Sequence, residues 1–209
     1  EVLPRNKYPE ETVQKILDAS LKLFLEKGYE ETTVLDIISE MGGLTRGAFY
    51  HHFKSKEEVF DALCEILFYE SNPFEKAKSH KELNGLEKLK FVLRTSFDET
   101  EHHQLSMASM QLLESPAFLK KLIESNQELA PMYQELIEEG IQDGSIQSEQ
   151  PKLLADLFVL LTNFWSIPTI YPMSDEEAWQ KFLMIKSVLD HLGLPVIDDE
   201  IVKLCKENA

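Results

Sequence analysis

Cysteine is nearly absent from this 209-residue sequence, which contains only Cys64 and Cys205. Neither belongs to a C-x-x-C unit, so a disulfide framework is not indicated and a reduced, cytoplasmic protein is expected. Eight glycines and nine prolines are too few for a collagen-like or low-complexity chain. The first 25 residues have scattered charges and no uninterrupted apolar stretch, so no signal peptide is expected there.

Long apolar runs and catalytic signatures are also missing. The one uncharged run long enough to test as a membrane span, residues 157–173, contains Asn163 and two prolines. It is shorter than the roughly 20 apolar residues that a spanning helix needs, so no membrane partner is expected. The G-x-x-x-x-G-K, H-E-x-x-H and G-x-S-x-G patterns do not occur. We therefore expect no enzyme, no cofactor and no metal.

Basic residues are scarce as well, with 21 Lys and Arg against 37 Asp and Glu and a formal net charge of −16. Such a charge argues against a nucleic-acid partner only if it is evenly spread. Residues 1–56 contain eight basic and nine acidic side chains, a net −1, and the other 153 residues carry −15. Residues 41–56 contain no acid but include Arg46, Lys54 and Lys56. This asymmetry predicts two domains with different partners.

The spacing of apolar residues is helical along nearly the whole chain, and no strand pattern or internal repeat is evident. For example, Val13, Ile16, Leu17, Leu21 and Phe24 form one stripe, and Gly28 follows as a helix end. The fold class predicted is all-α. Helices are expected over 10–27, 32–41, 45–52, 55–71, 85–100, 103–113, 116–143 (kinked or interrupted at Pro131), 152–165, 175–192 and 198–207.

Two helices near the C-terminus have patterns that favour association with a second chain. The helix over 152–165 has two parallel apolar stripes, and the helix over 175–192 has apolar spacings of 4, 3, 4 and 3, as in a coiled-coil seam. Paired with their copies, they predict a four-helix dimer interface. The alternative is that both are core helices of a monomer. The predicted interface residues are Leu153, Leu157, Leu160, Phe164, Ala178, Phe182, Ile185 and Leu189.

The segment from Thr32 to Lys56 is typical of a helix-turn-helix, because a glycine-containing turn joins two short helices and the second lacks acids. Gly47 and Ala48 would allow close approach to base edges, and Arg46 could bind a guanine. Phe49 and Phe53 are expected to face inward. The predicted phosphate contacts are Tyr50, His51, Lys54 and Lys56.

Residues 10–60 resemble the N-terminal domain of the TetR/AcrR family of bacterial transcriptional regulators. The resemblance depends on Phe24, the Gly28–Tyr29 helix end, Thr32–Thr33–Val34 and the Gly-x-Phe-Tyr-x-x-Phe-Lys-Ser-Lys run over 47–56. It implies a homodimer with a divergent helical C-terminal domain, which holds a ligand pocket and dimerises through its last two long helices. The family's base-reading positions fall on Thr45, Arg46, Gly47 and Ala48, and its backbone-contacting positions fall on Thr33, Tyr50, His51 and Lys56.

The turn over 41–45 is one residue longer than the Ala-Gly-Val-Ser turn usual in this family. The resemblance predicts a ligand-responsive repressor that binds a pseudo-palindromic DNA operator as a dimer and is released by a small-molecule effector. Residues 1–56 would form the DNA-binding domain and 72–209 the effector-binding and dimerisation domain, with the helix over 55–71 connecting them. The alternative is a helical small-molecule-binding or adaptor protein with a non-functional helix-turn-helix.

Several residues permit two interpretations. His51–His52 could be metal ligands, but adjacent helical residues point about 100° apart, which favours DNA contact. His102–His103, with Glu99 and Glu101, could form a metal or pocket site, or a solvated helix boundary. A ligand pocket is predicted at Met107, Met110, Phe158 and Trp165, because methionine and aromatic side chains suit adaptable apolar sites. At helical spacing the same residues could equally be ordinary core.

Overall fold

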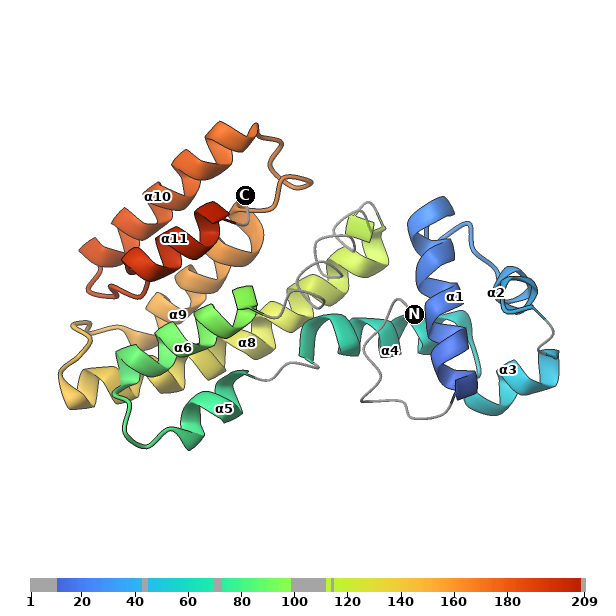
Figure 1. Cartoon of the computed structure of the whole chain (residues 1–209), viewed down its shortest axis with the longest axis horizontal. Helices are drawn as coiled ribbons and strands as arrows, with labels where there is room; N and C mark the ends of the chain where they lie inside the picture. The colour runs from blue at the N-terminus through green and yellow to red at the C-terminus, as the bar shows by residue number, and fades with distance from the viewer. Residues whose placement is uncertain (1–10, 43–44, 70–72, 99–111, 114, 208–209) are drawn as a thin grey trace. The chain divides into compact units, whose positions relative to one another are not determined.

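A computed structural model of the chain describes residues 11–42, 45–69, 73–98, 112–113 and 115–207, and the fold over these ranges is all-helical (Figure 1). The chain divides into two compact units. The N-terminal unit comprises Glu1–Ser71 and Thr100–Lys121, and the C-terminal unit comprises Asn72–Glu99 and Leu122–Ala209. None of the described helices is long and apolar enough to cross a membrane.

In the N-terminal unit, α1 (Glu11–Lys27) contacts α2 (Val34–Glu40), α3 (Arg46–His52) and α4 (Lys56–Tyr69) (Figure 1). The predicted stripe on α1 is confirmed, since Ile16, Leu17 and Leu21 are fully buried. Gly28 ends α1 with φ +88°, a backbone conformation that favours glycine. The periodicity of the sequence therefore placed this helix and its buried face correctly.

An aromatic cluster joins α1, the turn after it and α4. The Tyr29 ring lies 5.2 Å from the Phe24 ring and 4.4 Å from the Phe60 ring, measured between centroids. Phe118, near the start of α8 (Pro116–Asp143), adds a further ring 6.2 Å from Phe60. Burial, reinforced by the charge of Glu57, raises the pKa of Tyr29 to about 12, so its phenol stays neutral at physiological pH.

The C-terminal unit contains most of α8 and several helices that pack around it. These are α5 (Pro73–Ser79), α6 (Gly85–Asp98), α9 (Pro151–Leu160), the π-helix η2 (Leu161–Trp165), α10 (Asp175–His191) and α11 (Asp199–Glu207). Pro131 lies inside α8, which is one continuous helix, so of the two predicted effects of this proline, a kink or an interruption, the interruption does not occur. The expected helix over 103–113 lies outside the described residues apart from Leu112 and Leu113.

The core of the C-terminal unit is built mainly from α6, α8, α9, α10 and the segment 194–201. Val92, Leu136 and Phe158 are among its buried members. On the surface of the unit, Asp198 pairs with Lys90 at 3.2 Å and with Arg94 at 2.9 Å, which fixes α6 to the start of α11. The two helices are accordingly in contact.

The interface prediction on α10 needs correction at Ile185 and Leu189, which face the interior of the unit, whereas Ala178 and Phe182 are half-buried. Ile185 is 3% exposed and Leu189 is fully buried, and both belong to the core cluster, against which Phe182 also packs. A heptad-like spacing defines a stripe but not the surface that the stripe covers. Of the predicted interface residues before α10, Leu153 and Leu160 are exposed, and Leu157 and Phe164 are half-buried. The exposed large apolar side chains on α10 and just after it are Leu183, Met184 and Leu192.

Candidate nucleic-acid interface

The helix α3 is short, capped and anchored by one buried ring. Thr45 is its N-cap, and the Thr45 hydroxyl oxygen accepts a hydrogen bond from the Ala48 N–H at 3.2 Å. Because this bond uses the oxygen as acceptor, the Thr45 O–H is still able to donate to a phosphate. Phe49 is fully buried and Phe53 nearly so, which confirms that both rings face inward. The opposite side of α3 is therefore turned away from the core.

That outer side presents a cation and an aromatic ring. The Arg46 guanidinium carbon lies 5.6 Å from the centre of the Tyr50 ring, which is close enough for a cation–π contact. Arg46, Tyr50, His51 and Lys54 are all exposed. Among the described residues, neither Arg46 nor Lys54 has a carboxylate partner for its cationic group, so their charge is available to phosphates or base edges.

Gly47 has a free outer surface. A Cβ built at this position would have only one neighbour within 4 Å among the described atoms, the Thr45 hydroxyl oxygen at 3.8 Å. The backbone conformation at Gly47 is also one that any residue adopts, so the local fold does not require a glycine. A missing side chain at this point leaves the backbone of α3 open to close approach, as predicted for a groove-binding helix.

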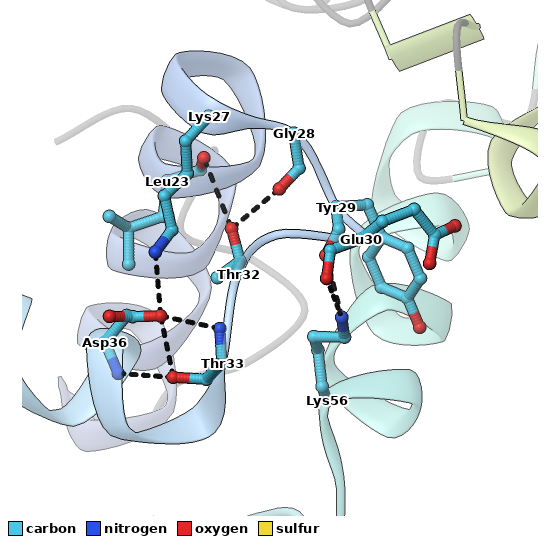
Figure 2. A network of polar contacts seen from close by, with 9 residues as sticks. All are labelled: Leu23, Lys27, Gly28, Tyr29, Glu30, Thr32, Thr33, Asp36 and Lys56. Carbon is cyan, nitrogen blue, oxygen red and sulfur yellow. Dashed lines mark hydrogen bonds and ion pairs between the residues drawn. The ribbon is translucent and has the colours of Figure 1, made fainter.

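The N-terminus of α2 is closed by a network that the sequence prediction did not include (Figure 2). Thr33 is the N-cap, and its hydroxyl donates to Asp36 Oδ2 at 2.6 Å while accepting from the Asp36 N–H at 3.2 Å. Lys27 Nζ lies 2.8 Å from the same Asp36 oxygen. Hydrogen bonds from Lys27 and then from Thr33 hold the pKa of Asp36 well below its usual range.

This network changes what Thr33 can do. Both hydrogen-bonding functions of its hydroxyl are used inside the protein, so a phosphate contact from that side chain would have to compete with Asp36. The neighbouring acid is also neutralised by Lys27, which limits its repulsion of a phosphate. The Thr-x-x-Asp spacing of a capping box was visible in the sequence and is the signal by which the network could have been found.

Lys56 is also placed differently from the prediction. Its ammonium donates to the Tyr29 carbonyl oxygen at 2.7 Å and to the Glu30 carbonyl oxygen at 3.3 Å (Figure 2). It also lies 4.2 Å from the centre of the Tyr29 ring. Lys56 therefore fixes the turn after α1 to the start of α4, and its charge is directed inward rather than presented freely to DNA. No local pattern could have shown this, since the partners are 26 and 27 residues away.

Of the four residues predicted to line a ligand pocket, the structure describes only Phe158 and Trp165. Phe158 is buried in the C-terminal unit with its ring 4.6 Å from Tyr133, and Trp165 is half-buried at the end of η2. Met107 and Met110 lie outside the described residues, as do His102 and His103 and the turn residues Gly43 and Leu44. Within the described ranges, no group of three or more His, Cys, Asp or Glu residues is arranged to hold a metal ion.

Comparisons with known proteins agree with this geometry. Residues 16–63 match the sequence profile described as "Bacterial regulatory proteins, tetR family". The chain is 29% identical over 181 residues to the HTH-type transcriptional repressor KstR2 of Mycolicibacterium smegmatis, covering 82% of this chain and 86% of that protein. These relatives are transcriptional regulators rather than enzymes.

Solved structures show the same fold. The gamma-butyrolactone receptor (ArpA-like protein) superposes with a TM-score of 0.64 at 19% identity, over 94% of this chain and 96% of that one. SmeT, the repressor of the Stenotrophomonas maltophilia multidrug efflux pump SmeDEF, gives 0.63 at 23% identity, over 86% and 92%. The profile match over residues 16–63 and the relative that aligns over 82% of this chain, together with the acid-free helix α3 that exposes Arg46 and Tyr50, show that this chain is a member of the TetR family of DNA-binding transcriptional regulators.

Proposed function

We propose that the chain is a ligand-responsive repressor that binds a pseudo-palindromic operator as a homodimer and is released by a small-molecule effector. Residues 1–56 would bind the DNA, and residues 72–209 would form the effector-binding and dimerisation domain, with the helix over 55–71 as the connection. A DNA partner places this activity in the cytoplasm. The repressor function is supported by the relatives named above, two of which are repressors by name.

The observation that carries the proposal is the exposed side of α3. Arg46 and Tyr50 on α3 and Lys54 just after it are exposed, and Gly47 leaves the backbone accessible. Residues 41–56 contain no acid. In a dimer, two such helices would enter successive major grooves about 34–36 Å apart. Direct base contacts are proposed for Thr45, Arg46, Gly47 and Ala48, and phosphate contacts for Tyr50, His51 and Lys54. For Thr33 and Lys56 we propose indirect roles, through the capping network and the α1–α4 connection.

The proposal predicts sequence-specific, salt-dependent binding to DNA that flanks the protein's own gene. If the dimer makes six or more phosphate contacts, affinity should fall on the order of 10³-fold between about 50 and 200 mM salt. Band shifts at several salt concentrations and a footprint would measure this, with a scrambled duplex of equal length as the control. Negligible affinity without a salt slope would instead favour a binding or adaptor protein with a non-functional helix-turn-helix.

The exposed leucines of α9 supply the prediction for the dimer. Leu153 and Leu160 are 58% and 54% exposed, which is unusual for large apolar side chains on one helix of a folded unit. Changing both to glutamate should place charge in the proposed interface and convert the dimer to monomers. Sedimentation equilibrium at micromolar concentration would measure this.

A matched control is available on α2, where Leu35 is 60% exposed but lies outside the proposed interface. Leu35→Glu should leave the dimer intact. An unchanged mass for Leu153→Glu/Leu160→Glu, or a monomeric wild type, would contradict the proposed interface.

A further inference from the structure

A pair of side-chain amides connects α8 to η2 inside the C-terminal unit. Asn163 Nδ2 donates to Asn126 Oδ1 at 2.7 Å. Asn126 is only 6% exposed, and its own Nδ2 has no hydrogen-bond partner among the described residues. Buried amide groups in folded proteins are nearly always hydrogen-bonded, so an unpartnered donor at this depth indicates a site for an acceptor.

The pair stands at one end of a row of apolar side chains. Asn126 precedes Ala130, Tyr133 and Ile137 by 4, 7 and 11 residues, which places all four on one face of α8. Ala130 and Ile137 belong to the core of the unit, and Tyr133 packs against that core. The Asn126 amide therefore stands beside apolar core side chains, and ligand sites combine such apolar surroundings with a few placed polar groups.

The backbone around Asn163 has an unusual conformation, a π-helix. The π-helix η2 follows α9 directly, and π-turns are rare in proteins and frequent at functional sites. The Thr162 hydroxyl donates back to the Phe158 carbonyl oxygen at 2.8 Å, which ties η2 to α9. Although η2 contains Leu161, Phe164 and Trp165, none of its residues is fully buried. This turn therefore has apolar side chains that the rest of the unit does not cover completely.

The electrostatics of the region favour an uncharged ligand group. Two residues beyond Asn163, the Trp165 carbonyl oxygen accepts a hydrogen bond from Lys181 Nζ at 2.8 Å, and that ammonium lies 5.0 Å from the centre of the Trp165 ring. The Lys181 ammonium is therefore held at Trp165, by the carbonyl oxygen and the ring, rather than at the Asn126 amide. The amide pair itself offers a neutral N–H and no cation, so a carboxylate or phosphate buried against it would lose its hydration without gaining a counter-charge, whereas a neutral oxygen would not carry that cost.

We infer that Asn126 and Asn163 form the polar subsite of the effector site, and that the effector is a mainly apolar molecule with an uncharged oxygen acceptor, such as a ketone, ester or amide. Asn126 Nδ2 donates to that oxygen, and Asn163 holds the Asn126 amide in place by donating a hydrogen bond to Asn126 Oδ1. This inference rests on the proposed ligand-responsive function and names the chemical class and two specificity-determining residues.

Two probes of nearly equal shape, cyclohexanone and methylenecyclohexane, test the inference. The carbonyl oxygen of the first is replaced by a methylene group in the second. Titration of the full-length protein, followed through the side-chain amide signals of asparagine in ¹H–¹⁵N spectra and by calorimetry, should show the ketone binding at least about 10-fold more tightly. Asn126→Leu should remove this preference. Gln127→Leu, which changes the exposed neighbour on the same helix, should retain it.

Stability separates a ligand subsite from a structural amide pair. Asn126→Leu/Asn163→Leu should keep or raise the Tm, because both partners are replaced by apolar groups and the unpartnered donor is removed. A lowered Tm, equal binding of both probes, binding of neither probe, or a preference that survives Asn126→Leu would overturn the inference. Band shifts on the same samples keep the two proposals apart, since operator binding that persists through any of these failures leaves the DNA-binding function standing.

Discussion

Replacing Arg46 and Tyr50 together by alanine is expected to abolish operator binding without unfolding the protein. Arg46 is the one arginine of the exposed α3 surface, and Tyr50 supports it through the 5.6 Å cation–π contact. A good bidentate contact to a base is worth roughly 1–3 kcal/mol, and a dimer loses it twice. Affinity for the operator should therefore fall on the order of 10²-fold or more, as measured by band shift at fixed salt.

The controls for this variant separate base recognition from charge. Lys54→Ala removes an exposed cation beyond the end of α3 and should weaken binding to every duplex by a similar factor, while reducing the salt slope by about one contact per protomer. Arg46→Lys keeps the charge at Arg46 but loses the planar, two-pronged geometry, so it should bind with relaxed sequence preference. Unchanged operator affinity in Arg46→Ala/Tyr50→Ala would contradict the assignment of α3 as the recognition helix.

The N-terminal unit was predictable from the sequence because its helix signals are local. Thr33 and Thr45, which are of a residue type that favours N-caps, cap α2 and α3, and Ser55 accepts from the Glu58 N–H at the start of α4. The Glu58 carboxylate in turn accepts a hydrogen bond from the Lys54 N–H at 2.7 Å. The contacts of Lys56 could not be predicted, because its partners, the carbonyls of Tyr29 and Glu30, are distant in sequence, and spacing along one helix carries no information about them.

In the C-terminal unit, periodicity located the helices but did not distinguish inner faces from outer faces. Ile185 and Leu189 were predicted at an interface and are core residues, because an apolar stripe looks the same in either setting. The change of pitch at η2 was likewise not predictable, since no residue type in Leu161–Trp165 signals a π-helix. Asn163 was noticed only as a polar residue in an uncharged run, and its significance depends on Asn126, 37 residues away.

Gly85→Ala is expected to destabilise the C-terminal unit strongly, because α6 begins against the backbone of α8. A Cβ at Gly85 would lie 2.1 Å from the Gly140 nitrogen, 2.5 Å from the Gly140 Cα and 2.7 Å from the Leu136 carbonyl oxygen. All three are backbone atoms, so no side-chain rotation relieves the overlap. A shift of α6 that relieved the overlap would also break the hydrogen bond that the Gly85 N–H donates to Asp143 Oδ2 at 2.7 Å.

Overpacking of this kind should cost about 3 kcal/mol of unfolding free energy. In a chain of this length that corresponds to a fall of roughly 6–12 °C in Tm, measurable by calorimetry or circular dichroism. Gly47→Ala is the matched control, because a Cβ there would meet only the Thr45 hydroxyl oxygen at 3.8 Å, an ordinary van der Waals distance, and alanine is the better helix former. Its Tm should therefore stay the same or rise slightly. The two glycines thus differ in their surroundings, since Gly85 permits two helix backbones to touch and Gly47 lies on the exposed surface of α3, where we propose the DNA contact. A Gly85→Ala protein as stable as Gly47→Ala would show that α6 and α8 do not approach each other this closely.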